Sequence, residues 1–280
     1  MRDLRLMDPS FPGQYPAVLS RKNAILVSAS NIRAVITASE VYLGNPSHKE
    51  AIAIAEAVRQ QLMTSNMPFE HIALECCLSQ ICASQSAQLQ VLRPYLRQVL
   101  HGLKAAGGSL QKRLDQLLPL KNQLDEMHTT LTAVARCLND VLTNNADMAQ
   151  MYLTDAQRHK KRKDSDHEDV ELIFENYLMQ VELISSDIKD DQNEITNTEE
   201  IVDIELDVIR NRILQVELLL SISAFMVALG ALWTGIFGMN LKSHLEEHPH
   251  MFWVVTGAIF AWIFTSIATT RWFCKRAGLL

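Results

Sequence analysis

Two long uncharged runs lie close to the C-terminal end of the chain, at residues 218–237 and 251–270. Each run makes about 30 Å of α-helix, which is enough to cross the hydrocarbon core of a bilayer. The stretch between them, residues 238–250, is mostly polar. The pattern therefore predicts an integral membrane protein with two spans and a large soluble part before them.

The residues before the first span continue its helical pattern. Apolar positions recur with helical spacing from residue 168 onward, and no proline interrupts residues 168–237. We interpret this stretch as one stalk helix about 100 Å long that runs into the first span. A helix of that length needs partners along its surface, and copies of the same chain are the simplest partners.

The rest of the soluble part divides by composition. Residues 1–45 contain several prolines and three short β-type runs, which predict a partial α/β element. Residues 46–154 have helical periodicity and form the predicted soluble helical domain. Residues 155–167 are a charged linker, which we expect to be a solvated turn between antiparallel helices. The three β-type runs are residues 24–28, 34–36 and 41–43.

Together these patterns predict a mostly α membrane protein. It has a helical soluble domain with a remnant α/β element at the N-terminus, one very long stalk and pore helix, and two C-terminal transmembrane helices. Composition adds little to this: a net charge of −6 gives no indication of nucleic-acid binding. The five cysteines form no paired motif, which indicates reduced thiols. We find no nucleophile and base constellation, phosphate loop or cofactor motif, so we expect neither an enzyme nor a cofactor.

Basic residues set the expected topology. The loop between the spans carries one base, Lys242, whereas several bases flank the spans on the other side. The positive-inside rule then places both termini on the inner side, with residues 271–280 as a basic inner tail. The flanking bases are Arg210, Arg212, Arg271, Lys275 and Arg276.

One face of the stalk and first span suits a pore. Steps of three and four from Asp203 select charged side chains in the stalk and small or hydroxyl side chains within the span. Such a stripe of small residues indicates either close helix packing or a narrow pore. We favour the pore, because charged residues continue the stripe inward and Asn240 offers an amide at its outer end. The predicted pore-lining residues are Asp203, Asp207, Arg210, Leu214, Glu217, Ser221, Ala224, Ala228, Ala231 and Gly235.

The charged end of this stripe has two interpretations. Asp207 and Arg210 form either a weak surface ion pair or two stacked rings around the axis, in which the Asp ring concentrates divalent cations and the Arg ring limits the flux. Glu217 opens the first span, where a carboxylate is costly unless it faces water. Leu214 is the predicted constriction.

Acidic residues crowd the stalk between residues 187 and 207, against a single base, Lys189. They either keep the stalk soluble and pair with bases of the earlier helices, or they bind divalent cations that stiffen the stalk and close the pore. The candidate ligands of regulatory Mg²⁺ are Asp187, Asp190, Asp191, Glu194, Glu199 and Glu200.

The loop between the spans adds two acids, Glu246 and Glu247, which we expect to attract hydrated cations. Its three histidines do not make a convincing zinc site, because histidines of a short polar loop are more often only polar. Mg²⁺ prefers oxygen ligands and keeps its water, so the amide of Asn240 suits contact with a hydrated ion.

Gly238-Met239-Asn240, placed directly after the first span, resembles the motif of the CorA magnesium channel superfamily. Further motifs resemble its eukaryotic branch, the mitochondrial-RNA-splicing-type magnesium channels that also occur in plants, and the likeness runs over essentially the whole chain. That family has strands and a helix before the first of these motifs, so we expect either that the chain is truncated at its N-terminus or that its N-terminal domain is reduced. The further motifs are Arg2-Asp3-Leu4-Arg5, Asp8-Pro9, Pro68-Phe69-Glu70, Ala73-Leu74-Glu75, Asp147-Met148-Ala149, Met151-Tyr152-Leu153-Thr154, Tyr177-Leu178-Met179-Gln180, and Leu206-Asp207 with Arg210-Asn211.

The resemblance implies a homopentamer in which the first span lines the pore and the second lies outside it. It implies that Asn240 selects the ion at the pore entrance, with Gly238 and Met239 shaping that entrance. It also implies that acidic residues of the soluble part bind regulatory Mg²⁺. The expected location is the mitochondrial inner membrane, with plastid, vacuolar and plasma membranes as alternatives.

We therefore predict a channel for Mg²⁺ influx whose partners are Mg²⁺, the lipid bilayer and other copies of the chain. Two alternatives stay open: a membrane-anchored coiled-coil tether, and a channel of the same type for Co²⁺, Ni²⁺ or Zn²⁺. A tether would tolerate loss of the Asn240 amide, and competition between cations in a flux measurement would separate the two channels.

Overall fold

A computed structural model describes residues 15–44, 49–104, 110–160, 162–163, 165–239 and 250–276. It divides into two compact units, Met1–Glu199 and Glu200–Leu280, and one helix runs from the first unit into the second. Several residues singled out from the sequence lie outside the described residues: Arg2, Asp3, Leu4, Arg5, Asp8, Pro9, Asn240, Glu246 and Glu247.

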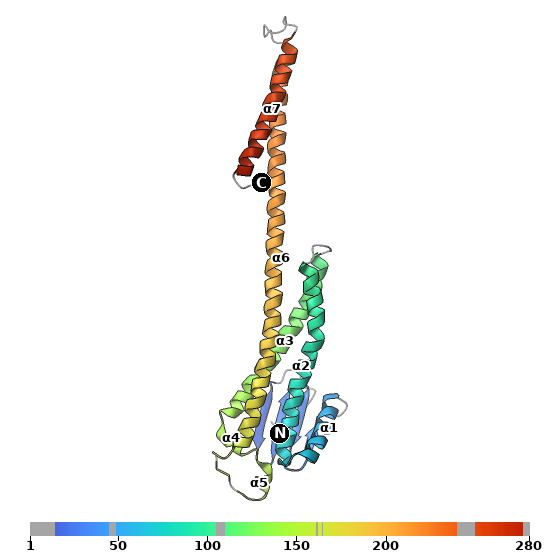
Figure 1. The fold of residues 1–280 in the computed structure, drawn as a ribbon. Helices are drawn as coiled ribbons and strands as arrows, with labels where there is room; N and C mark the ends of the chain where they lie inside the picture. Colours follow the sequence, from blue (N-terminus) through green and yellow to red (C-terminus); the bar gives the residue numbers. More distant parts are fainter. Residues whose placement is uncertain are drawn as a thin grey trace. The chain divides into compact units, whose positions relative to one another are not determined.

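The first unit begins with a four-stranded antiparallel sheet in sequence order (Figure 1). Its strands are β1 (Ala17–Arg21), β2 (Ala24–Ala29), β3 (Ile32–Ile36) and β4 (Val41–Leu43). Val18, Val27 and Ala34 lie side by side across three strands and are buried, because α2 and α3 pack against the sheet. The sequence pattern did not predict β1, because one of its two buried positions is the polar Ser20 and the other is Val18.

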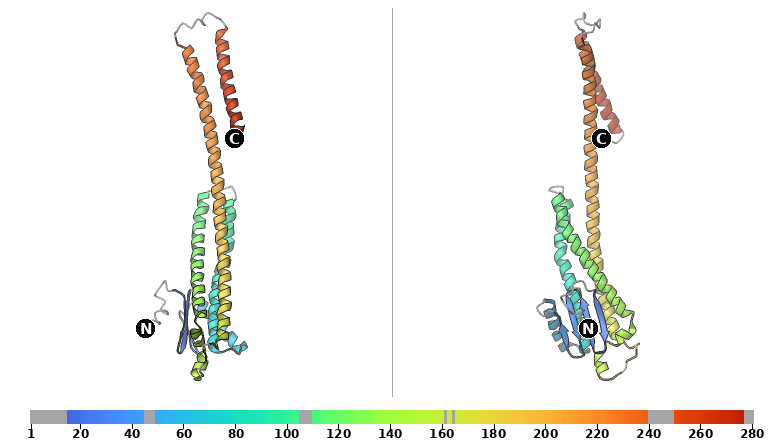
Figure 2. Two further views of the ribbon diagram at one scale, coloured as in Figure 1. Left: turned by 90° about the vertical axis from the view of Figure 1, so that its left-hand side faces the viewer. Right: turned by 180° about the vertical axis from the view of Figure 1, so that it is seen from behind.

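Long helices form the rest of this unit. They are α1 (Lys49–Thr64), α2 (Phe69–Lys104) and α3 (Leu110–Leu142), followed by two short helices, α4 (Asn145–Ala149) and α5 (Leu153–Gln157). Helices α2 and α3 pack against each other, and both run beside the first part of α6 (Figure 2). Leucines at helical spacing, such as Leu96, Leu100, Leu124 and Leu131, fill the space between the helices and are almost fully buried.

Helix α6 (Glu168–Phe237) is a single uninterrupted helix, as its continuous pattern predicted. Its first part buries Val181, Ile188 and Ile195 in the core of the first unit. Helix α7 (Met251–Arg276) follows in the second unit. Both α6 and α7 contain a stretch that is long and apolar enough to cross a membrane, and only 6% of that stretch in α6 and none in α7 is buried within the protomer. Lipid or further copies of the chain must therefore cover these apolar surfaces.

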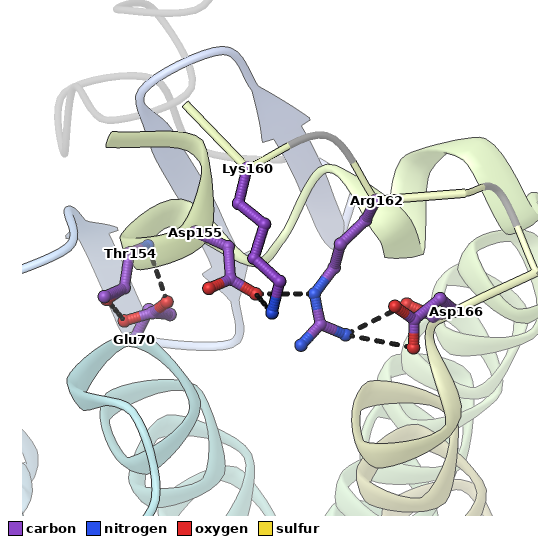
Figure 3. Close-up of polar contacts among 6 residues, drawn as sticks. All are labelled: Glu70, Thr154, Asp155, Lys160, Arg162 and Asp166. Atoms are coloured by element: carbon purple, nitrogen blue, oxygen red, sulfur yellow. Dashed lines mark hydrogen bonds and ion pairs between the residues drawn. The ribbon is translucent and has the colours of Figure 1, made fainter. Parts of the chain in front are cut away.

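Most described residues of the charged linker before α6 are exposed, but its Arg162 makes specific contacts. Arg162 lies over the ring of Tyr152, with its guanidinium carbon 3.6 Å from the ring centre. Its Nε donates to Asp155 at 2.6 Å, and its Nη1 donates to the carbonyl oxygen of Asp166 at 3.1 Å (Figure 3). The fold places this arginine between two acids and an aromatic ring, which no local spacing in the sequence indicates.

A buried carboxylate caps the short helix α5. Glu70, which is fully buried at the start of α2, accepts hydrogen bonds from the backbone N–H and the hydroxyl of Thr154, at 2.8 and 2.7 Å (Figure 3). The backbone N–H belongs to the first turn of α5, where a negative charge also interacts favourably with the helix dipole. Glu70 therefore joins two segments that lie far apart in the sequence.

Glu70→Ala is expected to lower the free energy of unfolding of the soluble part by about 2 kcal/mol or more, because two half-buried donors of Thr154 lose a charged acceptor. The exposed Glu56→Ala on α1 serves as the matched control and is expected to change little. Urea unfolding of the full-length protein in detergent, followed by far-UV circular dichroism, measures both variants. Equal midpoints for the two would contradict the capping role.

His71, next to Glu70, is buried without a hydrogen-bond partner for either ring nitrogen among the described residues. Its ring meets the edge of Tyr152 at a centroid distance of 4.6 Å. Burial lowers the pKa of His71 below its ordinary value; nearby Glu70, Asp169 and Asp155 act in the opposite direction, and Arg162 acts with burial. The folded protein thus holds a neutral imidazole that the unfolded chain protonates more readily.

The unfolded chain takes up this proton below about pH 6.5, so the stability of the wild type should fall as the pH drops below that value. His71→Phe should flatten this part of the pH profile. His101→Phe, at an exposed position of α2, should leave the profile unchanged. The measurement is the urea midpoint at a series of pH values from 7.5 to 5.5, and parallel profiles for His71→Phe and the wild type would refute the assignment.

Candidate ion-conduction site

All ten residues of the predicted pore stripe lie on α6 in the second unit, and all ten are exposed in the protomer. Helical spacing brings them onto one face, as Cβ positions three and four residues apart point in nearly the same direction. No described residue covers this face. The structure therefore places the stripe on one continuous uncovered surface that runs from the charged end of the stalk to the outer end of the span.

Helix α7 packs on a different face of α6, at Gly230. This glycine is buried, and a Cβ added to it would lie 2.7 Å from Cδ1 of Ile263 and 3.6 Å from Cγ2 of Ile259. Ala228 is two residues away from Gly230, which is about 200° around the helix. The stripe thus lies on the side of α6 away from α7, and small-residue packing inside the hairpin uses Gly230 rather than the stripe.

The outer end of the first span closes in a tightened turn. The backbone N–H of Gly238 donates to the carbonyl oxygens of Thr234 at 2.9 Å and Gly235 at 3.2 Å, and that of Met239 donates to Ile236 at 3.3 Å. A Cβ at Gly238 would lie only 3.3 Å from the Thr234 oxygen. The glycine therefore suits this close approach of backbone to backbone, which directs the chain out of the helix just before Asn240.

The charged residues of the stripe are free of ion pairs within the described residues. Asp207 and Arg210 are both exposed and do not pair with each other, so the surface-pair interpretation finds no support in the protomer. Glu217 is exposed at the start of the span, where an unpaired carboxylate is costly in lipid. These side chains require water, an ion or another copy of the chain.

The acidic part of the stalk divides into two groups. Arg93 of α2 binds Asp191 through Nε at 2.8 Å and Asp187 through Nη2 at 3.4 Å. Lys121 of α3 binds Glu199 at 2.9 Å. For three of the six candidate Mg²⁺ ligands, the structure thus agrees with pairing to bases of earlier helices.

The other three candidates, Asp190, Glu194 and Glu200, are exposed and have no ion pair with a described residue. Within the described ranges, no three His, Cys, Asp or Glu side chains converge into a group that could hold a metal ion. Sequence reasoning missed Arg93 and Lys121, because their partners lie far along the chain and no local spacing links them.

Three comparisons with known proteins bear on this site. A family model described as "Magnesium transporter MRS2-like" matches residues 1–210. The mitochondrial inner membrane magnesium transporter mrs2 of Schizosaccharomyces pombe is 33% identical over 270 residues, covering 93% of this chain and 64% of the relative. Magnesium transporter MRS2-B of Oryza sativa subsp. indica is 28% identical over 343 residues, covering 100% of this chain and 77% of the relative.

The chain spans 64% and 58% of the lengths of two fungal relatives, the second being LPE10 of Yarrowia lipolytica. Among solved structures, the CorA magnesium transporter from Methanocaldococcus jannaschii superposes with a TM-score of 0.70 at 17% identity, over 97% of this chain and 82% of that one. At this identity the structural likeness shows a shared fold.

Proposed function

Because the chain belongs to the MRS2-like family of magnesium transporters, we propose that it forms an ion channel for Mg²⁺ and does not act as an enzyme. The observation that carries this proposal is the exposed stripe on the side of α6 away from α7. Its unpaired charges and small side chains suit a surface that faces water rather than lipid.

A single α6 cannot enclose water, so the proposal needs several copies of the chain. We propose a homopentamer with α6 lining the axis and α7 on the outside, since α7 already covers the face of α6 opposite the stripe. The location that the fungal relatives' names support is the mitochondrial inner membrane. Because the bases that flank the two spans follow the positive-inside rule, the proposal has both termini on the inner side.

The proposed path starts at the outer loop, where Glu246 and Glu247 gather hydrated cations. Asn240 then selects among them by contact with their water, while Gly238 and Met239 shape the turn that presents it. Leu214 forms the constriction, and Asp207 with Arg210 form charged rings below it. A tether would leave these polar residues without a role in the membrane.

Mg²⁺ flux into proteoliposomes that contain the purified full-length protein tests the function. The expected result is a flux well above the leak of empty vesicles, driven by an inside-negative potential. Co²⁺, Ni²⁺ and Zn²⁺ in excess should compete only weakly. A flux equal to the leak would favour the tether, and stronger transport of another divalent cation would favour the rival channel.

We further propose that Mg²⁺ on the inner side closes the pore by binding exposed acids of the stalk, with ligands completed by a second copy of the chain. Asp190 and Glu194 are one turn apart on α6 and exposed, in contrast to the three acids bound by Arg93 and Lys121. Carboxylate oxygens are the ligands that Mg²⁺ prefers in proteins.

Asp190→Asn combined with Glu194→Gln is expected to raise the inner Mg²⁺ concentration needed for half-inhibition by about tenfold, because each lost carboxylate weakens the site. The matched control combines Glu126→Gln with Asp140→Asn, two exposed acids of α3. Flux at varied inner Mg²⁺ measures both. If the inner Mg²⁺ concentration for half-inhibition were unchanged in the first variant, Asp190 and Glu194 would not be the inhibitory site. The proposal of Mg²⁺ transport would not be affected.

A further inference from the structure

A small cavity in the first unit carries an excess of positive charge. It has a volume of about 290 Å³ and lies between the β1–β2 turn, α4, α5 and the linker before α6. Three bases line it, Lys22, Lys160 and Arg162, against one carboxylate, Asp155. The chain as a whole has a net charge of −6, so this concentration of bases runs against the overall balance.

The single carboxylate is shared among several bases. Arg162 binds Asp155 at 2.6 Å, and the ammonium of Lys160 lies 3.8 Å from the same oxygen atom. The hydrogen bond from Arg162, together with the charges of Lys160 and Arg158, holds the pKa of Asp155 below its usual value. The carboxylate of Asp166 also lies 3.4 Å from Nη1 of Arg162 and balances part of its charge. Lys22 and Lys160 still leave an excess of positive charge at this concave surface.

Lys22 contributes one charge to this excess. It lies in the two-residue turn between β1 and β2, is exposed, and forms no ion pair with another described residue. The fold brings it to the same cavity as Lys160, which is far away in the sequence. A turn of this kind needs no lysine for its conformation, so packing does not account for the charge at this position.

Arg162 is held firmly at the wall of this cavity. The ring of Tyr152 lies against its guanidinium. Asp155 and Asp166 fix its Nε and Nη1 (Figure 3). Its side chain is only 20% exposed. A planar donor group fixed in advance loses little entropy when it binds a phosphate, which is why arginine is common in phosphate sites.

We propose that this cavity binds a small soluble phosphate-bearing anion, held by Lys22, Lys160 and Arg162. Its volume lies at the lower end of the range for small-molecule sites, which suits pyrophosphate or a compact phosphorylated metabolite better than a whole nucleotide. The bound anion would join the β1–β2 turn to the linker that leads into α6. The inference does not depend on the proposed Mg²⁺ transport.

Isothermal titration of the full-length protein in detergent with pyrophosphate, in the presence of EDTA, tests the site. The wild type should bind one equivalent per chain, and Lys22→Gln and Lys160→Gln should each weaken binding by about tenfold, since each removes a charged hydrogen-bond donor. Lys22→Gln is the sharper variant, because Lys22 has no described ion pair whose loss could destabilise the fold. The control Lys189→Gln removes an exposed lysine of α6 and should bind like the wild type.

A second arm uses a short-chain phosphatidic acid in place of pyrophosphate. Binding of pyrophosphate that depends on Lys22 supports the proposal. No binding of pyrophosphate by the wild type, equal binding by Lys22→Gln and Lys189→Gln, or Lys22-dependent binding of phosphatidic acid alone would each overturn it, the last by assigning the cavity to a lipid headgroup.

Discussion

Asn240→Ala is expected to reduce Mg²⁺ flux into proteoliposomes by about tenfold or more. In the proposed channel each subunit would lose a polar group that contacts the hydrated ion, and hydrogen bonds to charged groups are worth ~1.5–3 kcal/mol. Asn240 follows the tightened turn at Gly238 and Met239, which ends α6 at the outer end of the stripe. Alanine keeps the backbone carbonyl at this point and removes only the amide. The change therefore isolates the contribution of the side chain to ion entry.

Asn197→Ala is the matched control, since Asn197 is an exposed asparagine in the soluble part of α6. We expect it to transport Mg²⁺ at the wild-type rate. Both variants should also show the wild-type size in detergent, which separates loss of conduction from loss of assembly. Equal flux through Asn240→Ala and the wild type would remove Asn240 from the selectivity site.

Ala228→Phe should abolish the flux altogether. Ala228 lies in the middle of the first span on the exposed stripe, about 200° around α6 from the contact with α7 at Gly230. In a pentamer with the stripe facing the axis, the substitution would place a ring of phenyl groups in the path of a hydrated ion. Flux at the level of empty vesicles is the expected result.

The control for size and hydrophobicity is Ala261→Phe. Ala261 is exposed in the middle of α7, two residues from both Ile259 and Ile263 and so on the opposite side from the contact with α6. Here the phenyl group should enter lipid and leave the flux unchanged. If Ala261→Phe abolished the flux and Ala228→Phe did not, α7 rather than α6 would line the pore.

The sequence alone was sufficient to predict the long elements. Without a proline between residues 168 and 237, the apolar periodicity allows only one helix, and α6 has these limits. The two uncharged runs predicted both membrane helices for the same reason. Helix length and apolar periodicity depend on neighbouring residues along the chain, so they can be read from a single sequence.

Features that depend on tertiary contacts were missed or left open. Strand β1 escaped notice because its inward Ser20 and terminal Arg21 interrupt the apolar alternation, and only the sheet supplies its partners. Most described residues of the linker are exposed, but the contacts that hold its Arg162 over Tyr152 and between two acids could not be predicted. No pattern in the sequence indicates which base will meet which acid across the fold.

For the stripe of small residues on α6, the structure adds information that the sequence does not contain. Small residues at steps of three and four allowed either packing or a pore, and spacing alone does not decide between them. The contact between Gly230 and Ile263 settles which face of α6 meets α7 and leaves the stripe uncovered. What covers the stripe in the membrane is a question about the assembly of several chains.

A density map of the purified particle in a lipid nanodisc tests the central proposal most directly. We predict copies of α6 arranged around a central axis, with Ser221, Ala224 and Ala228 facing a continuous axial opening and α7 outside them. A map in which these three side chains are packed against lipid or a neighbouring helix, with no opening on the axis, would contradict the proposed channel.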